Sequence, residues 1–277
     1  MKESIPRITG TLRAHSIEMP EAIWDAPGMI VLGRRIRSLI FTTDIAIIRN
    51  CDADAVLAVY PFTPQQVISE AIINASSIPV FVGVGGGTTK GLRSVYMAQD
   101  AEAQGAFGVV VNNPMSNTNI ALIKRVIDIP VVATVIDSDD FEDRLRAGAT
   151  ILNVAAGPKT PQIVREIRKK DPKVPIIASG GPTNETVKAT IEAGTNAVVY
   201  TPPSVAEIFT AMMNDYRGLK IRNPEFTLKT LDSKRDELMD LLELLHHHSP
   251  DGDLATGDAA TADSVDEKAT GKPDSAV

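Results

Sequence analysis

Short apolar runs alternate with amphipathic stretches along most of this chain of 277 residues. Each run is rich in Val and Ile and is bounded by turn residues, which is typical of buried parallel strands. The stretches between the runs, such as 64–76 and 161–170, repeat apolar residues at helical spacing. The runs are 38–44, 55–62, 79–86, 108–114, 130–137, 150–157, 175–181 and 196–203. The pattern therefore predicts eight strand–helix units.

The runs are entered in two alternating ways. The third, fifth and seventh begin at a proline, in SIPVF, DIPVV and KVPII, whereas the fourth, sixth and eighth follow a glycine that ends the helix before. Proline suits the start of a strand and glycine the end of a helix. Eight such units predict an α/β fold, a closed (β/α)8 TIM barrel. The first unit is short, and without it the pattern would give an open doubly wound sheet.

Four segments follow from this pattern. We predict an N-terminal extension at 1–37, the barrel at 38–217, a C-terminal helix within 218–248 and a disordered acidic tail at 249–277. The extension would cap the bottom of the barrel or fold over one end, and its stretch 25–33 would supply an extra strand. The C-terminal helix is amphipathic, so it would pack on the barrel or form the contact of a homo-oligomer.

Composition and charge narrow the class of protein. Apolar residues make up 43% of the chain and charged residues 23%, which allows a large core. The net charge is −7, and the tail contributes −5 to it through seven acids and two lysines. The sequence contains no basic surface that would predict nucleic-acid binding. No apolar stretch approaches the ~20 residues of a membrane helix. The single cysteine, Cys51, excludes an internal disulfide and favours a cytoplasmic location.

Active sites of such barrels lie at the carboxyl ends of the strands, which directs attention to polar residues there. Asp44 ends the first strand and Asp137 the fifth; one would act as a general base while the other orients substrate or binds Mg²⁺. Asn112 and Asn153 would donate hydrogen bonds to substrate or to a developing oxyanion. The alternatives are a helix N-cap for Asp44 and a turn residue for Asp137.

The stretch IIASGGPTNET at 176–186 carries two adjacent glycines, Gly180 and Gly181, after the seventh strand. Loops after the seventh and eighth strands form the usual phosphate site of the fold. We predict an anion site at these glycines and at three nearby hydroxyls, those of Thr183, Thr201 and Ser204. The alternative is that the glycines only turn the chain at the rim.

Residues 176–209 resemble the last quarter of the phosphate-binding barrel superfamily, which includes 2-keto-3-deoxy-phosphogluconate aldolase, N-acetylmannosamine-6-phosphate epimerase and thiazole synthase. The whole chain also looks like a bacterial family of barrels commonly labelled hydrolases. The superfamily's Schiff-base aldolases carry a lysine on the sixth strand. Here Asn153 lies in that strand, and Lys159, just beyond it, is a further catalytic candidate that would reach the mouth by loop folding.

A second glycine-rich loop, GVGGGTT, follows the third strand. Its spacing does not match a dinucleotide-binding fingerprint. Gly85, Gly86 and Gly87 would let the backbone approach substrate, or would form a flexible loop.

These residues predict a cytoplasmic barrel enzyme that acts on a small anionic, carbohydrate-like and phosphorylated metabolite by proton-transfer chemistry of the lyase or isomerase kind. One alternative is hydrolysis by water activated at Asp44 or Asp137, with or without Mg²⁺ as cofactor. Another is a barrel that binds a ligand without catalysis.

The tail at 249–277 gives a first prediction. It contains only three large aliphatic residues, so it cannot bury enough surface to offset its ordering entropy. We expect a chain that ends at residue 248 to melt at the same temperature as the full chain in calorimetry. A drop of several degrees would show that the tail packs against the rest of the protein.

Overall fold

The computed structural model describes residues 17–216. The predicted C-terminal helix, the acidic tail and the first part of the N-terminal extension lie outside the described residues. The predicted homo-oligomer contact lies there as well.

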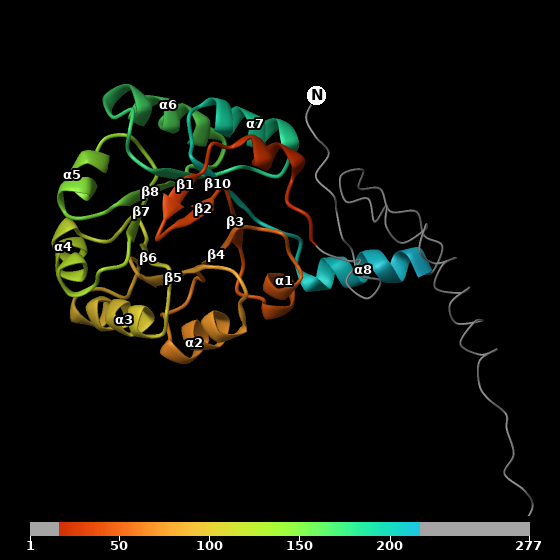
Figure 1. The fold of residues 1–277 in the computed structure, drawn as a ribbon, viewed down its shortest axis with the longest axis horizontal. Helices are drawn as coiled ribbons and strands as arrows, with labels where there is room; N and C mark the ends of the chain where they lie inside the picture. Colours follow the sequence, from red (N-terminus) through yellow and green to blue (C-terminus); the bar gives the residue numbers. More distant parts are fainter. Residues whose placement is uncertain (1–16, 217–277) are drawn as a thin grey trace, which may run out of the picture. The chain divides into compact units, whose positions relative to one another are not determined.

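Eight parallel strands close into a barrel in the order β10-β3-β4-β5-β6-β7-β8-β9 (Figure 1). Each strand lies within one of the predicted apolar runs. Closure is made by β10 and β3, where Val199 pairs with Leu39. The predicted (β/α)8 barrel is therefore confirmed, and the open sheet is excluded. The strands are β3 (Ser38–Phe41), β4 (Ala55–Ala58), β5 (Val80–Gly85), β6 (Gly108–Val111), β7 (Val131–Val135), β8 (Ile151–Val154), β9 (Ile176–Ser179) and β10 (Ala197–Tyr200).

The strands alternate with helices, and α1 to α7 lie around the outside of the barrel (Figure 1). In α6, Ile163, Val164 and Ile167 are buried while Arg165 and Lys169 are exposed, because apolar residues at helical spacing share the face toward the strands. The helices are α1 (Ile45–Arg49), α2 (Gln66–Ala75), α3 (Leu92–Ala103), α4 (Asn117–Val126), α5 (Phe141–Arg146), α6 (Thr160–Lys170), α7 (Asn184–Glu192) and α8 (Val205–Tyr216), with short 3-10 turns η2 (Glu21–Asp25) and η3 (Gly157–Lys159).

A hairpin closes the amino end of the barrel. Strands β1 (Met29–Val31) and β2 (Arg34–Ile36) pair antiparallel, so the extra strand predicted within 25–33 is β1. Its turn, Leu32 and Gly33, has positive φ at both residues, which suits a tight hairpin. Val31 and Ile36 are buried in one apolar cluster with barrel residues such as Phe81 and Ile177. With one end filled, space for a ligand remains only at the other.

The glycine pair after β9 is required by the packing of the chain itself. A Cβ on Gly180 would lie 2.5 Å from Val198 Cγ1 and 3.0 Å from Val187 Cγ2. Gly181 has φ of 75°, a conformation that favours glycine. Gly180 therefore lets the end of β9 contact β10 and α7 directly.

Replacement of Gly180 tests this packing role. We expect Gly180→Ala to lower the free energy of unfolding by about 1–3 kcal/mol, because Val198 and Val187 are buried and stiff at χ1. Gly87→Ala is the matched control, since nothing lies within 4 Å of a Cβ there, and it should change stability by less than ~0.5 kcal/mol. Urea denaturation measures both, and equal effects would contradict the packing argument.

Candidate functional site

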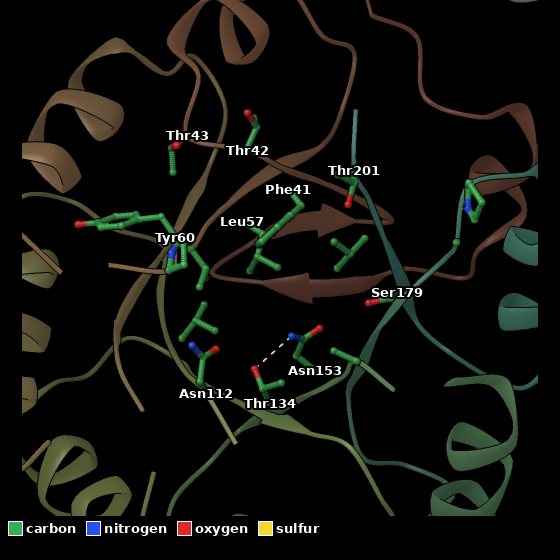
Figure 2. Close-up of a pocket in the computed structure, with 17 residues that line it drawn as sticks. Phe41, Thr42, Thr43, Leu57, Tyr60, Asn112, Thr134, Asn153, Ser179 and Thr201 are labelled. Atoms are coloured by element: carbon green, nitrogen blue, oxygen red, sulfur yellow. Dashed lines mark hydrogen bonds between the residues drawn. The ribbon is translucent and has the colours of Figure 1, made fainter. Parts of the chain in front are cut away.

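A cavity of about 940 Å³ opens at the carboxyl ends of the barrel strands (Figure 2). This is the end at which barrels of this fold carry their active sites. The cavity is lined by Phe41, Thr42, Thr43, Leu57, Val59, Tyr60, Pro61, Val110, Asn112, Thr134, Asn153, Ala155, Ser179, Gly181, Pro182, Val199 and Thr201. Its size suits a small organic molecule.

The floor of the cavity is largely apolar, with one polar pair, Asn153 and Thr134. Leu57, Val110 and Val199 are buried in the barrel interior. Among them stands Asn153, which is 7% exposed and belongs to a strand whose four residues are all buried. Asn153 pairs in register with Thr134 on β7, so the two side chains emerge side by side at the centre of the barrel (Figure 2).

Asn153 is only half satisfied. Its Nδ2 donates to Thr134 Oγ1 at 3.2 Å, while its Oδ1 has no hydrogen-bond partner among the described residues. The oxygen is turned away from Thr134 in Figure 2. An unsatisfied buried acceptor costs roughly 1–3 kcal/mol, so folded proteins rarely keep one without a use for it. A ligand group that donates a hydrogen bond would satisfy it.

The rest of the polar lining is neutral. Hydroxyls come from Thr42, Thr43, Ser179 and Thr201, and an amide comes from Asn112. No carboxylate, lysine, arginine or histidine of the described residues lines the cavity.

Tyr60 is the one lining residue with a titratable side chain. Its Oη accepts a hydrogen bond from Gln65 N at 2.8 Å, and Figure 2 shows the hydroxyl pointing away from the cavity. The Tyr60 hydroxyl therefore holds the loop that leads to α2 and does not face the cavity.

The two predicted carboxylates lie outside the cavity lining. Asp44 is the N-cap of α1, and its Oδ1 accepts hydrogen bonds from Ala46 N at 2.8 Å and Ile47 N at 3.3 Å. Asp137 is exposed, and its Oδ1 accepts from Asp139 N at 3.1 Å. Both make the local contacts that the alternative interpretations anticipated. A catalytic role for either stays a prediction.

The structure separates the other predicted catalytic residues. Asn112 and Asn153 both line the cavity. Lys159 is exposed at the end of η3 and is not among the lining residues. The amides are thus brought together, and the lysine is not.

The second glycine loop borders a smaller cavity of about 90 Å³, which shares Tyr60 and Asn112 with the first. Gly85 and Gly87 line it. Gly86 instead packs on the backbone of Asn112, just after β6, because a Cβ there would lie 2.6 Å from Asn112 N. Its absent side chain is what lets Asn112 take its place at the rim.

Arg144 is a residue that the sequence did not single out. It is 6% exposed on α5, and its Nη2 donates to Asn113 O at 2.6 Å while its Nη1 donates to Met115 O. Its Nε contacts Asp140 Oδ2 at 3.1 Å. The guanidinium therefore braces the loop that carries Asn112. In the sequence, an arginine in an amphipathic helix gives no signal of such a contact.

Only some residues of the predicted anion site line the cavity. Gly181 and Thr201 line the cavity, whereas Thr183 and Ser204 cap helices. Thr183 Oγ1 accepts from Thr186 N at 3.3 Å, and Thr186 Oγ1 accepts from Thr183 N at 3.1 Å. Phosphate binding at these residues stays a prediction.

The part of the chain that the structure describes contains no set of side chains suited to bind a magnesium ion. No group of three or more His, Cys, Asp or Glu side chains there is arranged to hold a metal. The cavity itself offers only hydroxyl and amide oxygens, whereas Mg²⁺ in proteins is held through carboxylates. The residues described thus do not fit a resident Mg²⁺.

Comparisons with known proteins bear on the fold. No family model and no curated protein matches the chain. Among residues 17–216, no helix has the length and apolar character needed to cross a membrane.

Solved structures do match. Phosphoenolpyruvate phosphomutase from Streptomyces platensis subsp. rosaceus is 14% identical with a TM-score of 0.54, over 86% of this chain and 100% of that one. Phosphonopyruvate hydrolase with oxalate and Mg²⁺ is 17% identical with a TM-score of 0.52, over 84% and 97%. A 2,3-dimethylmalate lyase of the PEP mutase/isocitrate lyase superfamily is 14% identical with a TM-score of 0.53, over 86% and 100%.

At such identities the likeness establishes the fold alone. One of these neighbours is named as a member of the PEP mutase/isocitrate lyase superfamily, and none of the three is the aldolase, epimerase or synthase that residues 176–209 resemble. The sequence resemblance is therefore supported only as far as the (β/α)8 barrel.

Proposed function

We propose that the protein is a barrel enzyme that takes a small, oxygen-rich metabolite into the cavity and stabilises negative charge as it develops on one of its oxygens. The observation that carries this proposal is the half-satisfied Asn153 at the floor. Asn153 Oδ1 would accept a hydrogen bond from a hydroxyl or amine group of the ligand, because an acceptor is satisfied only by a donor.

The same floor offers donors for a second ligand oxygen. Thr134 accepts from Asn153, which leaves its own hydroxyl proton free to be donated onward. Ser179, Thr201 and the Asn112 amide stand around it. A compound that carries a hydroxyl beside a carbonyl would satisfy both sets at once. Neutral donors aimed at an oxygen stabilise an enolate or alkoxide as it forms, which is the need of lyase and isomerase reactions.

The fold neighbours support this class of substrate by analogy. Three of them are named for phosphoenolpyruvate, phosphonopyruvate and 2,3-dimethylmalate, which are small organic acids. Their names favour a small anionic substrate and a lyase, mutase or hydrolase reaction. No step through Mg²⁺ is proposed here, because the described cavity residues do not fit that ion.

A ligand-binding barrel without catalysis is the second candidate. The observation in its favour is that no lining residue among those described turns an ionisable head group into the cavity. General acid–base catalysis normally requires such a group within hydrogen-bond reach of substrate. Hydrolysis at Asp44 or Asp137 is less well supported, since both carboxylates make local caps outside the lining.

One experiment distinguishes these candidates. The purified protein is incubated with a mixture of small metabolites, and mass spectrometry follows each compound in solution and on the protein. A compound that is converted identifies an enzyme, and one that is retained unchanged identifies a binder. A protein that neither converts nor retains anything in a broad mixture would contradict both.

Asn153→Leu tests the residue on which the proposal depends. We expect at least about tenfold weaker binding or slower turnover, from the loss of buried hydrogen bonds. Stability should not fall, because leucine removes an unsatisfied oxygen that costs roughly 1–3 kcal/mol. The compound found above and thermal unfolding provide the two measurements.

Asn117→Leu is the matched control for this variant. Asn117 Oδ1 also lacks a partner, but the residue lies at the start of α4, outside the cavity lining. The control should keep full binding or turnover. If Asn153→Leu keeps it too, Asn153 does not contact the ligand.

A further inference from the structure

The two helices that follow β9 and β10 begin only a few residues after residues that line the cavity. Gly181 and Pro182, which line the cavity, precede α7, and Thr201, which also lines it, precedes α8. Free N–H groups at such helix starts form the usual phosphate site of (β/α)8 barrels. Whether those groups are free therefore decides which ligands the mouth accepts.

At the start of α8, a carboxylate of the helix itself accepts the hydrogen bond of the N–H just before the helix. Ser204 N and Ser204 Oγ both donate to Glu207 Oε2 at 2.7 Å, and Glu207 N donates back to Ser204 Oγ at 3.2 Å. These hydrogen bonds lower the pKa of Glu207, so the carboxylate is ionised at neutral pH. Pro202 and Pro203, just before, have no N–H to offer.

At α7 the arrangement is similar. The N–H groups of Thr183 and Thr186 are taken by the reciprocal cap between these two residues. Hydrogen bonds from its own N–H and from the Thr183 side chain lower the pKa of Glu185, which is therefore also ionised. Pro182 contributes no donor. A negative charge of the chain thus accompanies each of the two helix starts.

The cavity beside them contains no compensating cation among the described residues, while its floor holds the unsatisfied Asn153. We propose that Glu185 and Glu207 are specificity-determining residues that exclude phosphorylated compounds from the mouth, so that the ligand is an unphosphorylated hydroxyl or carbonyl compound. The ligand itself rests on the function proposed above, but the exclusion of phosphate does not.

The physical reason is charge and competition together. A phosphate group brings a charge of about −1.5 to −2 at neutral pH and needs several donors. Here it would compete with the Glu207 carboxylate at α8 and with the threonine cap at α7. It would also be repelled by the charges of Glu185 and Glu207. A neutral hydroxyl or carbonyl meets neither obstacle.

The test uses inorganic phosphate as the probe and the full chain as the protein. Phosphate is titrated at constant ionic strength, and binding is followed through the amide NMR signals of residues 183–186 and 204–207. The variant is Glu185→Gln with Glu207→Gln, since glutamine keeps the shape of glutamate and can still close a cap. The control is Glu70→Gln with Glu192→Gln, which removes the same charge from exposed positions elsewhere on α2 and α7.

We expect the variant to bind phosphate about 3- to 30-fold more tightly than the unaltered protein, and the control to show no such gain. Three results would overturn the proposal: tight phosphate binding by the unaltered protein, an equal gain in the control, or no gain in the variant. Because the probe is phosphate alone, each result is independent of whether Asn153 binds a substrate. A failure of the proposed function would instead appear in the Asn153→Leu experiment.

Discussion

Closure of the barrel between β10 and β3 is the constraint on which the rest of the structure depends. Once Val198 to Tyr200 pair with Ser38 to Ile40, every barrel strand has two neighbours and the carboxyl ends of all eight meet in one ring. Side chains that point inward must then share a single interior. At the amino end, large apolar residues and the β1–β2 hairpin fill it. At the carboxyl end, apolar side chains such as Leu57 and Val110 and polar ones such as Asn153 do not fill the interior, and a cavity remains.

That cavity carries a polar group where folding alone gives no reason for one. Every other residue of β8 is apolar and buried, and a leucine or valine at position 153 would leave no orphan oxygen. The bond to Thr134 satisfies only one half of the amide. Residues that lower the stability of the fold and make no compensating contact in it are commonly residues that bind a ligand or take part in a reaction. Asn153 is therefore the strongest single sign of function in the described chain.

The sequence predicted the fold well because each strand–helix unit is a local pattern. The eight runs contain the eight barrel strands, and the short first unit gives a helix of only five residues. It also singled out Asn112 and Asn153, which both line the cavity, since a position near the end of a strand follows from the pattern. It could not predict which way a strand-end side chain turns. Asp44 turns to a helix N-terminus, and the brace by Arg144 joins residues about thirty positions apart.

The same helix chemistry explains why the cavity lining is neutral although acids follow so many strands. An unsatisfied N–H at a helix start attracts the nearest oxygen, and Asp44, Glu185 and Glu207 all stand within the first turn or just before it. Each carboxylate that caps a helix is withdrawn from the cavity, and each capped helix loses its power to bind an external anion. The described cavity is left with hydroxyls and amides, which recognise a ligand by the direction of its hydrogen bonds rather than by its charge. Chemistry in such a site has to draw on the polarity of the substrate's own oxygens, since the described lining offers no ionised group to exchange a proton with it.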